Sequence, residues 1–142
     1  MADWKLTLSI LPETFAVCRL EPNAELPVWA TQGSFCSFTR TPQEVSIVCP
    51  QDNVPEGVLA EKSWRGLKIE GPMAFNFTGV LVSLARPLAA AGVSIFTLAT
   101  YETDYLLLKE QDLPRALLAL SDEGHHVLPE SQEQHPSDLF SR

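Results

Sequence analysis

The chain has 142 residues, of which 45% are hydrophobic, and a formal net charge of −8, so its length suits one compact domain or two joined half-size ones. An acidic surface is repelled by nucleic-acid phosphates and by anionic lipids, so we expect neither partner. The apolar runs are too short for a membrane span, and the start of the sequence shows no export signal, so we expect a cytoplasmic protein.

The first half of the chain predicts strands joined by short irregular segments, because apolar and polar residues alternate between Pro- and Asn-containing breaks. Leu11-Pro12-Glu13 separates the first two strands, and Gly71-Pro72 ends the last. In order, the predicted elements are strands over 6–10 and 15–20, a short helix over 27–31, strands over 35–40 and 45–49, a loop or single helical turn over 50–55, and a strand over 64–70.

The second half predicts two helices and four strands. Thr78 is suited to begin the first helix and Gly92 to end it, and Asp112 and Gly124 have the same roles for the second. Pro87 lies inside the first helix and should kink it or end its regular part early. In order, the elements are a strand over 73–77, a helix over 78–91, strands over 94–100 and 105–108, a helix over 113–123, and a strand over 125–128.

This order of elements, βαββαβ, predicts an antiparallel four-stranded sheet with both helices on one face. Leu106-Leu107-Leu108 is apolar on both faces of its strand, so the other face should also be covered, by the other half of the chain or by a second subunit. Residues 129–142 are polar and without periodicity, and we expect a disordered tail.

The two halves also share a pattern at an offset of 60 residues without a gap, although few of the paired residues are identical. Ser34–Val48 and Ser94–Leu108 each have the pattern of a strand, a four-residue turn and a strand. The turns expected are Thr41–Glu44 and Tyr101–Asp104, each closed by an acidic residue. A small α+β unit repeated in this way would gain a core by pairing with its twin.

The three cysteines have no C-x-x-C spacing, so buried free thiols are the favoured reading. If Arg40 pairs with Val45, Cys36 lies opposite Cys49, which leaves a disulfide as the alternative, although a reducing cytosol disfavours one. His125-His126 is not a favoured metal site, because neighbouring side chains of a strand point to opposite faces. No nucleotide-binding loop or nucleophile motif occurs, so we expect no cofactor and no catalysis.

The segments Phe77–Leu81, Pro87–Gly92, Ser94–Phe96 and Thr100–Tyr105 resemble those of ACT domains, the ferredoxin-like βαββαβ modules that bind amino acids and regulate enzymes. The likeness is to small bacterial tandem-ACT proteins, a group similar to the eukaryotic cytosolic arginine sensors. It implies an α+β fold of two tandem ferredoxin-like units. The implied limits are a degenerate N-terminal unit at 1–63, a C-terminal ACT domain at 64–128 and a tail at 129–142.

The resemblance also implies a ligand site at an interface between units, formed by the start of a helix, the start of the following strand and the second hairpin. Helix N–H groups near Gly79 would suit a carboxylate, and Asp104 would suit an ammonium or guanidinium group. The alternative for Asp104 is a simple turn residue. The implied ligand-binding residues are Thr78, Gly79, Val93, Ser94, Ile95, Phe96, Thr100, Tyr101 and Asp104.

We therefore expect a non-catalytic sensor or regulatory protein that binds a small ligand, an amino acid by the resemblance, forms a homodimer and acts on a regulated protein partner. The alternative is an ACT-like scaffold that dimerises or binds proteins without a ligand. The N-terminal unit departs from the pattern, because the offset of 60 places Cys18 and Arg19 where the C-terminal unit has Thr78 and Gly79. We expect it to be mainly structural.

Overall fold

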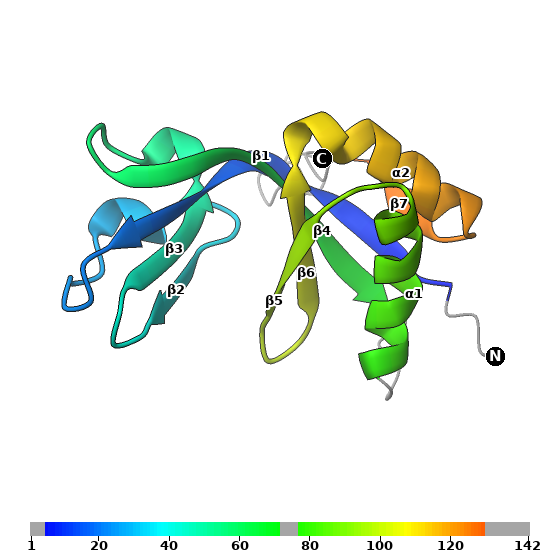
Figure 1. Ribbon diagram of the computed structural model, residues 1–142, viewed down its shortest axis with the longest axis horizontal. Helices are drawn as coiled ribbons and strands as arrows, with labels where there is room; N and C mark the ends of the chain where they lie inside the picture. Colours follow the sequence, from blue (N-terminus) through cyan, green and yellow to red (C-terminus); the bar gives the residue numbers. More distant parts are fainter. Residues whose placement is uncertain (1–4, 72–76, 130–142) are drawn as a thin grey trace, which may run out of the picture. The chain divides into compact units, whose positions relative to one another are not determined.

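The computed structural model of the protein describes residues 5–71 and 77–129, with the side chains of Phe77 and Thr78 outside that description. It divides into two compact units (Figure 1). The N-terminal unit comprises residues 13–64, and the C-terminal unit comprises the residues up to Pro12 together with those from Arg65 onward. The predicted division at residues 63 and 128 stays a prediction, and the predicted tail lies almost wholly outside the described residues.

The first strand, β1 (Thr7–Leu20), runs through Pro12 without a break, so the two strands predicted on either side of Pro12 are one. Strand β7 (His126–Leu128) pairs in parallel with Thr7–Ser9, and β3 (Val45–Pro50) pairs antiparallel with Phe15–Leu20. Pro12 lies between these two registers. A residue without an N–H is tolerated in a strand where no ladder bond requires that group.

The sheet of the C-terminal unit has the strand order β7, β1, β4, β6, β5. Here β4 spans Leu59–Gly71, β6 spans Asp104–Lys109 and β5 spans Ile95–Ala99. Strands β5 and β6 form an antiparallel hairpin, whereas β7 is parallel to β1. The strand predicted over 73–77 falls on residues 73–76, outside the described residues, and on Phe77, which is helical. Strand β4 precedes the first helix instead.

Helices α1 (Phe77–Ala90) and α2 (Leu113–Asp122) lie side by side against this sheet (Figure 1). Helix α1 continues through Pro87 for three more residues, so the predicted early end at Pro87 is wrong. Gly92 and Gly124, with φ of +77° and +93°, end the two helices in the left-handed conformation, as predicted. Asp112 stands before α2 as predicted, but it makes no capping bond and pairs with Arg115 at 2.9 Å.

The core of the C-terminal unit is formed by alternate residues of the strands and by the inner stripes of both helices. Its thirteen buried residues are Leu6, Leu8, Ile10, Leu67, Ile69, Val80, Leu84, Leu88, Val93, Leu106, Leu108, Ala116 and Leu120. Leu107, whose side chain points to the opposite face of β6 from its neighbours, is only 1% exposed. The second face of that strand is therefore covered within a single chain at this position.

The N-terminal unit consists of strands and short 3-10 turns among its described residues. Strand β2 (Ser37–Arg40) pairs with β3, and Arg40 lies opposite Val45 as predicted. The predicted helix at 27 is a 3-10 turn, η1 (Val28–Thr31), and the turn after β3 is η2 (Gln51–Asn53). The helical segments described in this unit are thus single 3-10 turns, and its identity as a degenerate ACT-like unit stays a prediction.

The three cysteines gather in the core of the N-terminal unit as free thiols. Cys18 and Cys49 are buried, and Cys36 packs against them. Burial raises the pKa of the Cys49 thiol to about 12 and also raises the pKa of the other two. Because the thiolate is the reactive form, these side chains behave as small hydrophobic groups.

The described chain as a whole is a mixed α and β structure with antiparallel hairpins, as the α+β prediction requires, and its two α-helices lie in the C-terminal unit. Among the described residues, no helix is long and apolar enough to cross a membrane.

Candidate functional site

Asp104 is the first residue of β6 and not, as the sequence predicts, the last residue of the hairpin turn. The turn consists of Thr100 to Thr103. The N–H of Thr100 donates to the Thr103 carbonyl over 2.8 Å, and the N–H of Thr103 donates to Thr100 Oγ1 over 3.2 Å. Asp104 then pairs with Ala99 of β5. The shift of one residue moves this carboxylate from an exposed turn into the sheet.

Asp104 is only 8% exposed, and burial raises the pKa of its carboxyl group above the usual value. Removal of the carboxyl group from water is the cause of this shift, because burial disfavours the charged form. An acidic side chain kept in such surroundings is a candidate functional group, because a fold gains nothing from burying an uncompensated charge.

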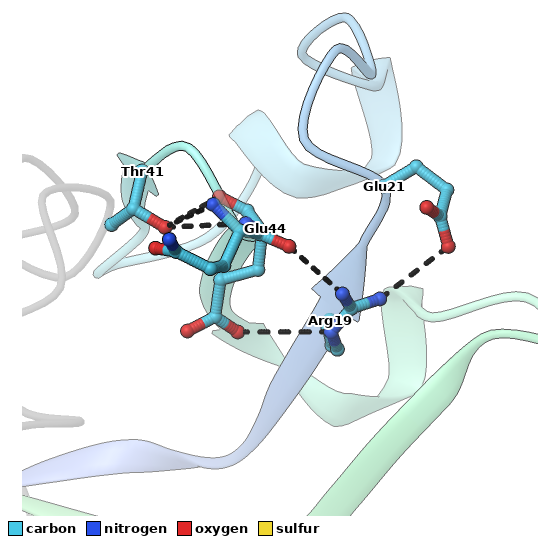
Figure 2. Close-up of polar contacts among 5 residues, drawn as sticks. Arg19, Glu21, Thr41 and Glu44 are labelled. Atoms are coloured by element: carbon cyan, nitrogen blue, oxygen red, sulfur yellow. Dashed lines mark hydrogen bonds and ion pairs between the residues drawn. The ribbon is translucent and has the colours of Figure 1, made fainter.

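The first hairpin provides an internal comparison for the second. Figure 2 shows its turn, where the N–H groups of Gln43 and Glu44 donate to Thr41 Oγ1 over 3.1 and 3.2 Å. The N–H of Thr41 donates to the Glu44 carbonyl over 2.8 Å, as Thr100 does to Thr103 in the second hairpin. Thr41 therefore corresponds to Thr100, and the hairpins repeat at an offset of 59 residues rather than the predicted 60.

The corrected offset places Val45 in the first hairpin where Asp104 stands in the second. Each residue opens its strand, and Val45 is completely buried. The corresponding position thus belongs to the core in one hairpin and carries a carboxylate in the other. A hairpin of this kind does not need an acid at this position, which argues that Asp104 is present for another reason.

A further feature of the first turn is its contact with Arg19. Its Nη2 donates to the Gln43 carbonyl over 2.9 Å, and its guanidinium group also lies 4.0 Å from Glu44 and 3.4 Å from Glu21 (Figure 2). These groups are substantially exposed, so the ion pairs contribute little stability, and the interaction chiefly closes the first turn. In the second turn Tyr101 is fully exposed at 102% of its reference area.

Thr103 connects the second turn to the end of β4, a role that sequence analysis missed. Its Oγ1 donates to the Ile69 carbonyl over 2.7 Å. Two residues after Ile69, β4 ends, and the chain then leads into α1, which begins at the same end of the C-terminal unit as the hairpin turn (Figure 1). Only the strand pairing, and no sequence motif, reveals this connection.

The predicted site residues consequently fall into two groups. Thr100, Tyr101 and Asp104 lie at the hairpin turn, at the end of the unit where α1 begins with Thr78 and Gly79 in its first turn. The first turn of a helix directs its N–H groups outward along the axis, which suits an anion.

The second group lies at the other end of β5, where Ile95 pairs with Leu108. Ala99 follows Ile95 by four positions, which corresponds to about 13 Å along a strand. Val93 is buried in the core and donates its N–H to the Leu88 carbonyl over 2.9 Å, Ser94 is exposed, and Phe96 is half-buried. One C-terminal unit therefore does not gather both groups around one small ligand.

Within residues 5–71 and 77–129, no group of three His, Cys, Asp or Glu side chains is arranged to hold a metal ion. His125 is buried at 5% exposure and His126 is exposed, so the two rings are separated as their alternation in the chain predicts.

Comparison with known families gives two matches that together cover most of the chain. A model of the ACT domain matches residues 59–122, and a model of an N-terminal domain matches residues 13–57. The boundary between these matches lies close to the division between the two structural units.

Individual relatives agree with this assignment. The chain is 31% identical over 100 residues to the bovine protein named cytosolic arginine sensor for mTORC1 subunit 1, a match that covers 63% of this chain and 30% of the sensor. The chain thus spans about a third of that relative's length. A crystal structure of an Agobacterium tumefaciens protein is 37% identical, has a TM-score of 0.84, and is matched over 89% of this chain and 95% of that one.

The fold also occurs in regulatory proteins of more distant sequence. The regulatory subunit of aspartate kinase from Thermus thermophilus has a TM-score of 0.56 at 12% identity, with 78% of this chain and 93% of that chain covered. At this identity the likeness concerns the fold alone.

Proposed function

Residues 59–122 of this chain belong to the ACT-domain family, and from this premise we propose that the protein is a non-catalytic regulatory protein that binds an amino acid. The relatives named as cytosolic arginine sensors support this proposal, and they also support a cytoplasmic location.

The observation that carries the proposal is the buried carboxylate of Asp104. Burial raises its pKa, and the corresponding residue of the first hairpin is a buried valine. A ligand with an ammonium or guanidinium group would supply the missing charge partner and form charge-assisted hydrogen bonds with it. The first turn of α1, at the same end of the unit, would receive the ligand carboxylate.

This arrangement favours an amino acid with a cationic side chain. Its two ends carry opposite charges, and they match the acid of β6 and the N–H groups of the helix. The residues at the other end of β5, Val93 to Phe96, would complete a site only if they came from a second copy of the chain. We therefore place the ligand between two copies in a homodimer. Ligand binding would change how the two copies pack, and a protein partner would recognise that change.

The test is calorimetric titration with the twenty amino acids, supported by thermal shift. At about a hundred times its dissociation constant, a ligand adds roughly 2.7 kcal/mol to the free energy of unfolding. We expect a selective response to arginine or lysine and its loss in Asp104→Asn. Glu102→Gln is the matched control, because it removes one negative charge from an exposed residue of the same turn. It should bind as the unsubstituted protein does.

Each result separates the two function classes considered. Binding that Asp104→Asn abolishes and Glu102→Gln preserves supports the sensor. An absence of heat and of thermal shift with every amino acid contradicts it and supports a scaffold without a ligand. Binding that survives Asp104→Asn contradicts the assigned site while leaving a sensor in place.

A further inference from the structure

Pro87 removes one hydrogen bond from the C-terminal part of α1. In an α-helix the carbonyl of each residue accepts the N–H of the residue four positions later, and proline has no N–H. The carbonyl affected is that of Ser83. This group is partly buried, so the loss of its helical partner would be costly if nothing replaced it.

The ring of His125 lies at that carbonyl. Its Nε2 is 3.0 Å from the Ser83 oxygen, and its Nδ1 is 3.1 Å from the backbone nitrogen of Leu6. The ring is only 5% exposed. Both ring nitrogens therefore lie at hydrogen-bond distance from a backbone group, one in α1 and the other in Leu6, the residue just before β1.

The chemistry of these two partners determines the tautomer. A backbone carbonyl can only accept a hydrogen bond, so Nε2 must carry the proton. A backbone N–H can only donate, so Nδ1 must be without one. We propose that His125 is a neutral, Nε2-protonated histidine that replaces the hydrogen bond lost at Pro87 and thereby ties α1 to the N-terminal strand.

The corresponding position after α1 shows why a histidine is unusual here. Both helices end in the same motif, in which the residue after the glycine donates its N–H to the carbonyl five residues before it. Val93 donates to Leu88 over 2.9 Å, and His125 donates to Leu120 over 3.0 Å. This position normally makes an apolar contact with the preceding turn, as Val93 does. A polar ring at the second such position is explained by the Ser83 carbonyl.

The direct test is the tautomer of His125 in the unsubstituted protein at neutral pH. Long-range nitrogen–proton NMR correlations distinguish a protonated from an unprotonated ring nitrogen. We expect His125 to show a protonated Nε2 and an unprotonated Nδ1, with the exposed His126 as the internal reference. A proton on Nδ1, or an equal mixture of the two tautomers, would overturn the proposal.

A double-mutant cycle tests the coupling to Pro87. His125→Leu should increase the unfolding equilibrium constant in the Pro87 protein about tenfold more than in the Pro87→Ala background, where the substituted residue has an N–H to donate to the Ser83 carbonyl. The loss of the acceptor for Leu6 is common to both backgrounds and cancels. His126→Leu, at the neighbouring exposed residue, should show no such difference.

Equal effects of His125→Leu in the two backgrounds would refute the replacement of the helix bond and leave His125 as ordinary packing. If His125→Leu does not fold, the tautomer measurement decides alone, because it requires no substitution. Neither experiment involves the amino-acid ligand, so the result is independent of the proposed function.

Discussion

At the residue scale, the binding role proposed for Asp104 conflicts with the stability of the fold. Its carboxylate is buried at the start of β6, and burial raises its pKa. Groups that serve binding are often held in surroundings that a stable fold would not select. The cost should be visible in how stability changes with pH.

The sign of this effect follows from linkage. Because the pKa of Asp104 is raised in the folded state, the folded protein holds a proton that the unfolded chain has already lost. This favourable contribution is fully present below the unfolded pKa, about 3.9, and is lost as the pH rises through the folded value. Asp104→Asn should therefore raise the melting temperature at pH 7, and the gain should shrink as the pH falls through the raised folded pKa towards the unfolded value of about 3.9.

Melting curves of the two proteins across this pH range measure the difference directly, since the titration of all other carboxylates is common to both. Glu102→Gln should follow the unsubstituted protein at each pH. A variant Asp104→Asn that is less stable at pH 7, or a difference that does not change with pH, would show that the buried carboxylate is compensated by a partner.

At the element scale, the two hairpins correspond over more than their strands. Strand β3 is followed directly by η2, and β6 is followed directly by the 3-10 turn η3 (Glu110–Asp112), with both pairs of elements at an offset of 59 residues. The correspondence ends there, since α2 follows η3 but no helix follows η2 in the described residues of the N-terminal unit. Because the two hairpins correspond residue by residue, Val45 and Asp104 occupy equivalent positions and can be compared directly.

Exchanging the side chains at this position should have opposite effects in the two hairpins. Val45→Asp removes a buried apolar side chain and places a charge in the core of the N-terminal unit, so we expect a loss of at least about 3 kcal/mol in the free energy of unfolding. Asp104→Val removes a buried charge and should stabilise the protein at neutral pH. Urea denaturation of both variants makes the comparison, and a similar loss in both would contradict the correspondence of the two positions.

The same elements show where the sequence was sufficient for prediction. Alternation and capping residues predicted both hairpins, both helices and the glycines that end them, because these signals are local. The turn of the second hairpin was predicted one residue too late, because Thr-Tyr-Glu-Thr and Tyr-Glu-Thr-Asp are both acceptable four-residue turns. Only the hydrogen bond from Thr100 to Thr103 decides between them. The continuity of β1 through Pro12 also depends on its partners, which local sequence does not contain.

At the scale of the whole molecule, the sequence proposes residues for the candidate site but does not contain their arrangement. Asp104 was identified from its resemblance to a family motif, whereas its burial follows from the strand pairing. Thr103 and His125 act through backbone carbonyls of Ile69 and Ser83, which are distant in sequence and carry no residue-specific signal. The register of β5 with β6 separates the remaining predicted residues into two groups at opposite ends of the strand.

That separation leads to a prediction about assembly. If the ligand is bound by Asp104 of one copy and by the start of β5 of another, it binds the dimer more tightly than the monomer. By linkage, the ligand must then strengthen dimerisation by the same factor. A coupling of about 1–3 kcal/mol, typical of allosteric proteins, corresponds to a roughly 5–150-fold lower dissociation constant of the dimer. Sedimentation equilibrium with and without the amino acid identified by calorimetry measures this constant.

The variant Asp104→Asn should retain the ligand-free dimer constant and lose the change on addition of the ligand, whereas Glu102→Gln should retain both. A dimer constant that does not change while the ligand binds normally would contradict a site shared between copies. In that case Val93 to Phe96 would have no part in binding, and one copy would hold the ligand at the hairpin turn alone. The register of β5 makes these two outcomes distinct, because no single ligand can contact both ends of that strand by a small adjustment of the turn.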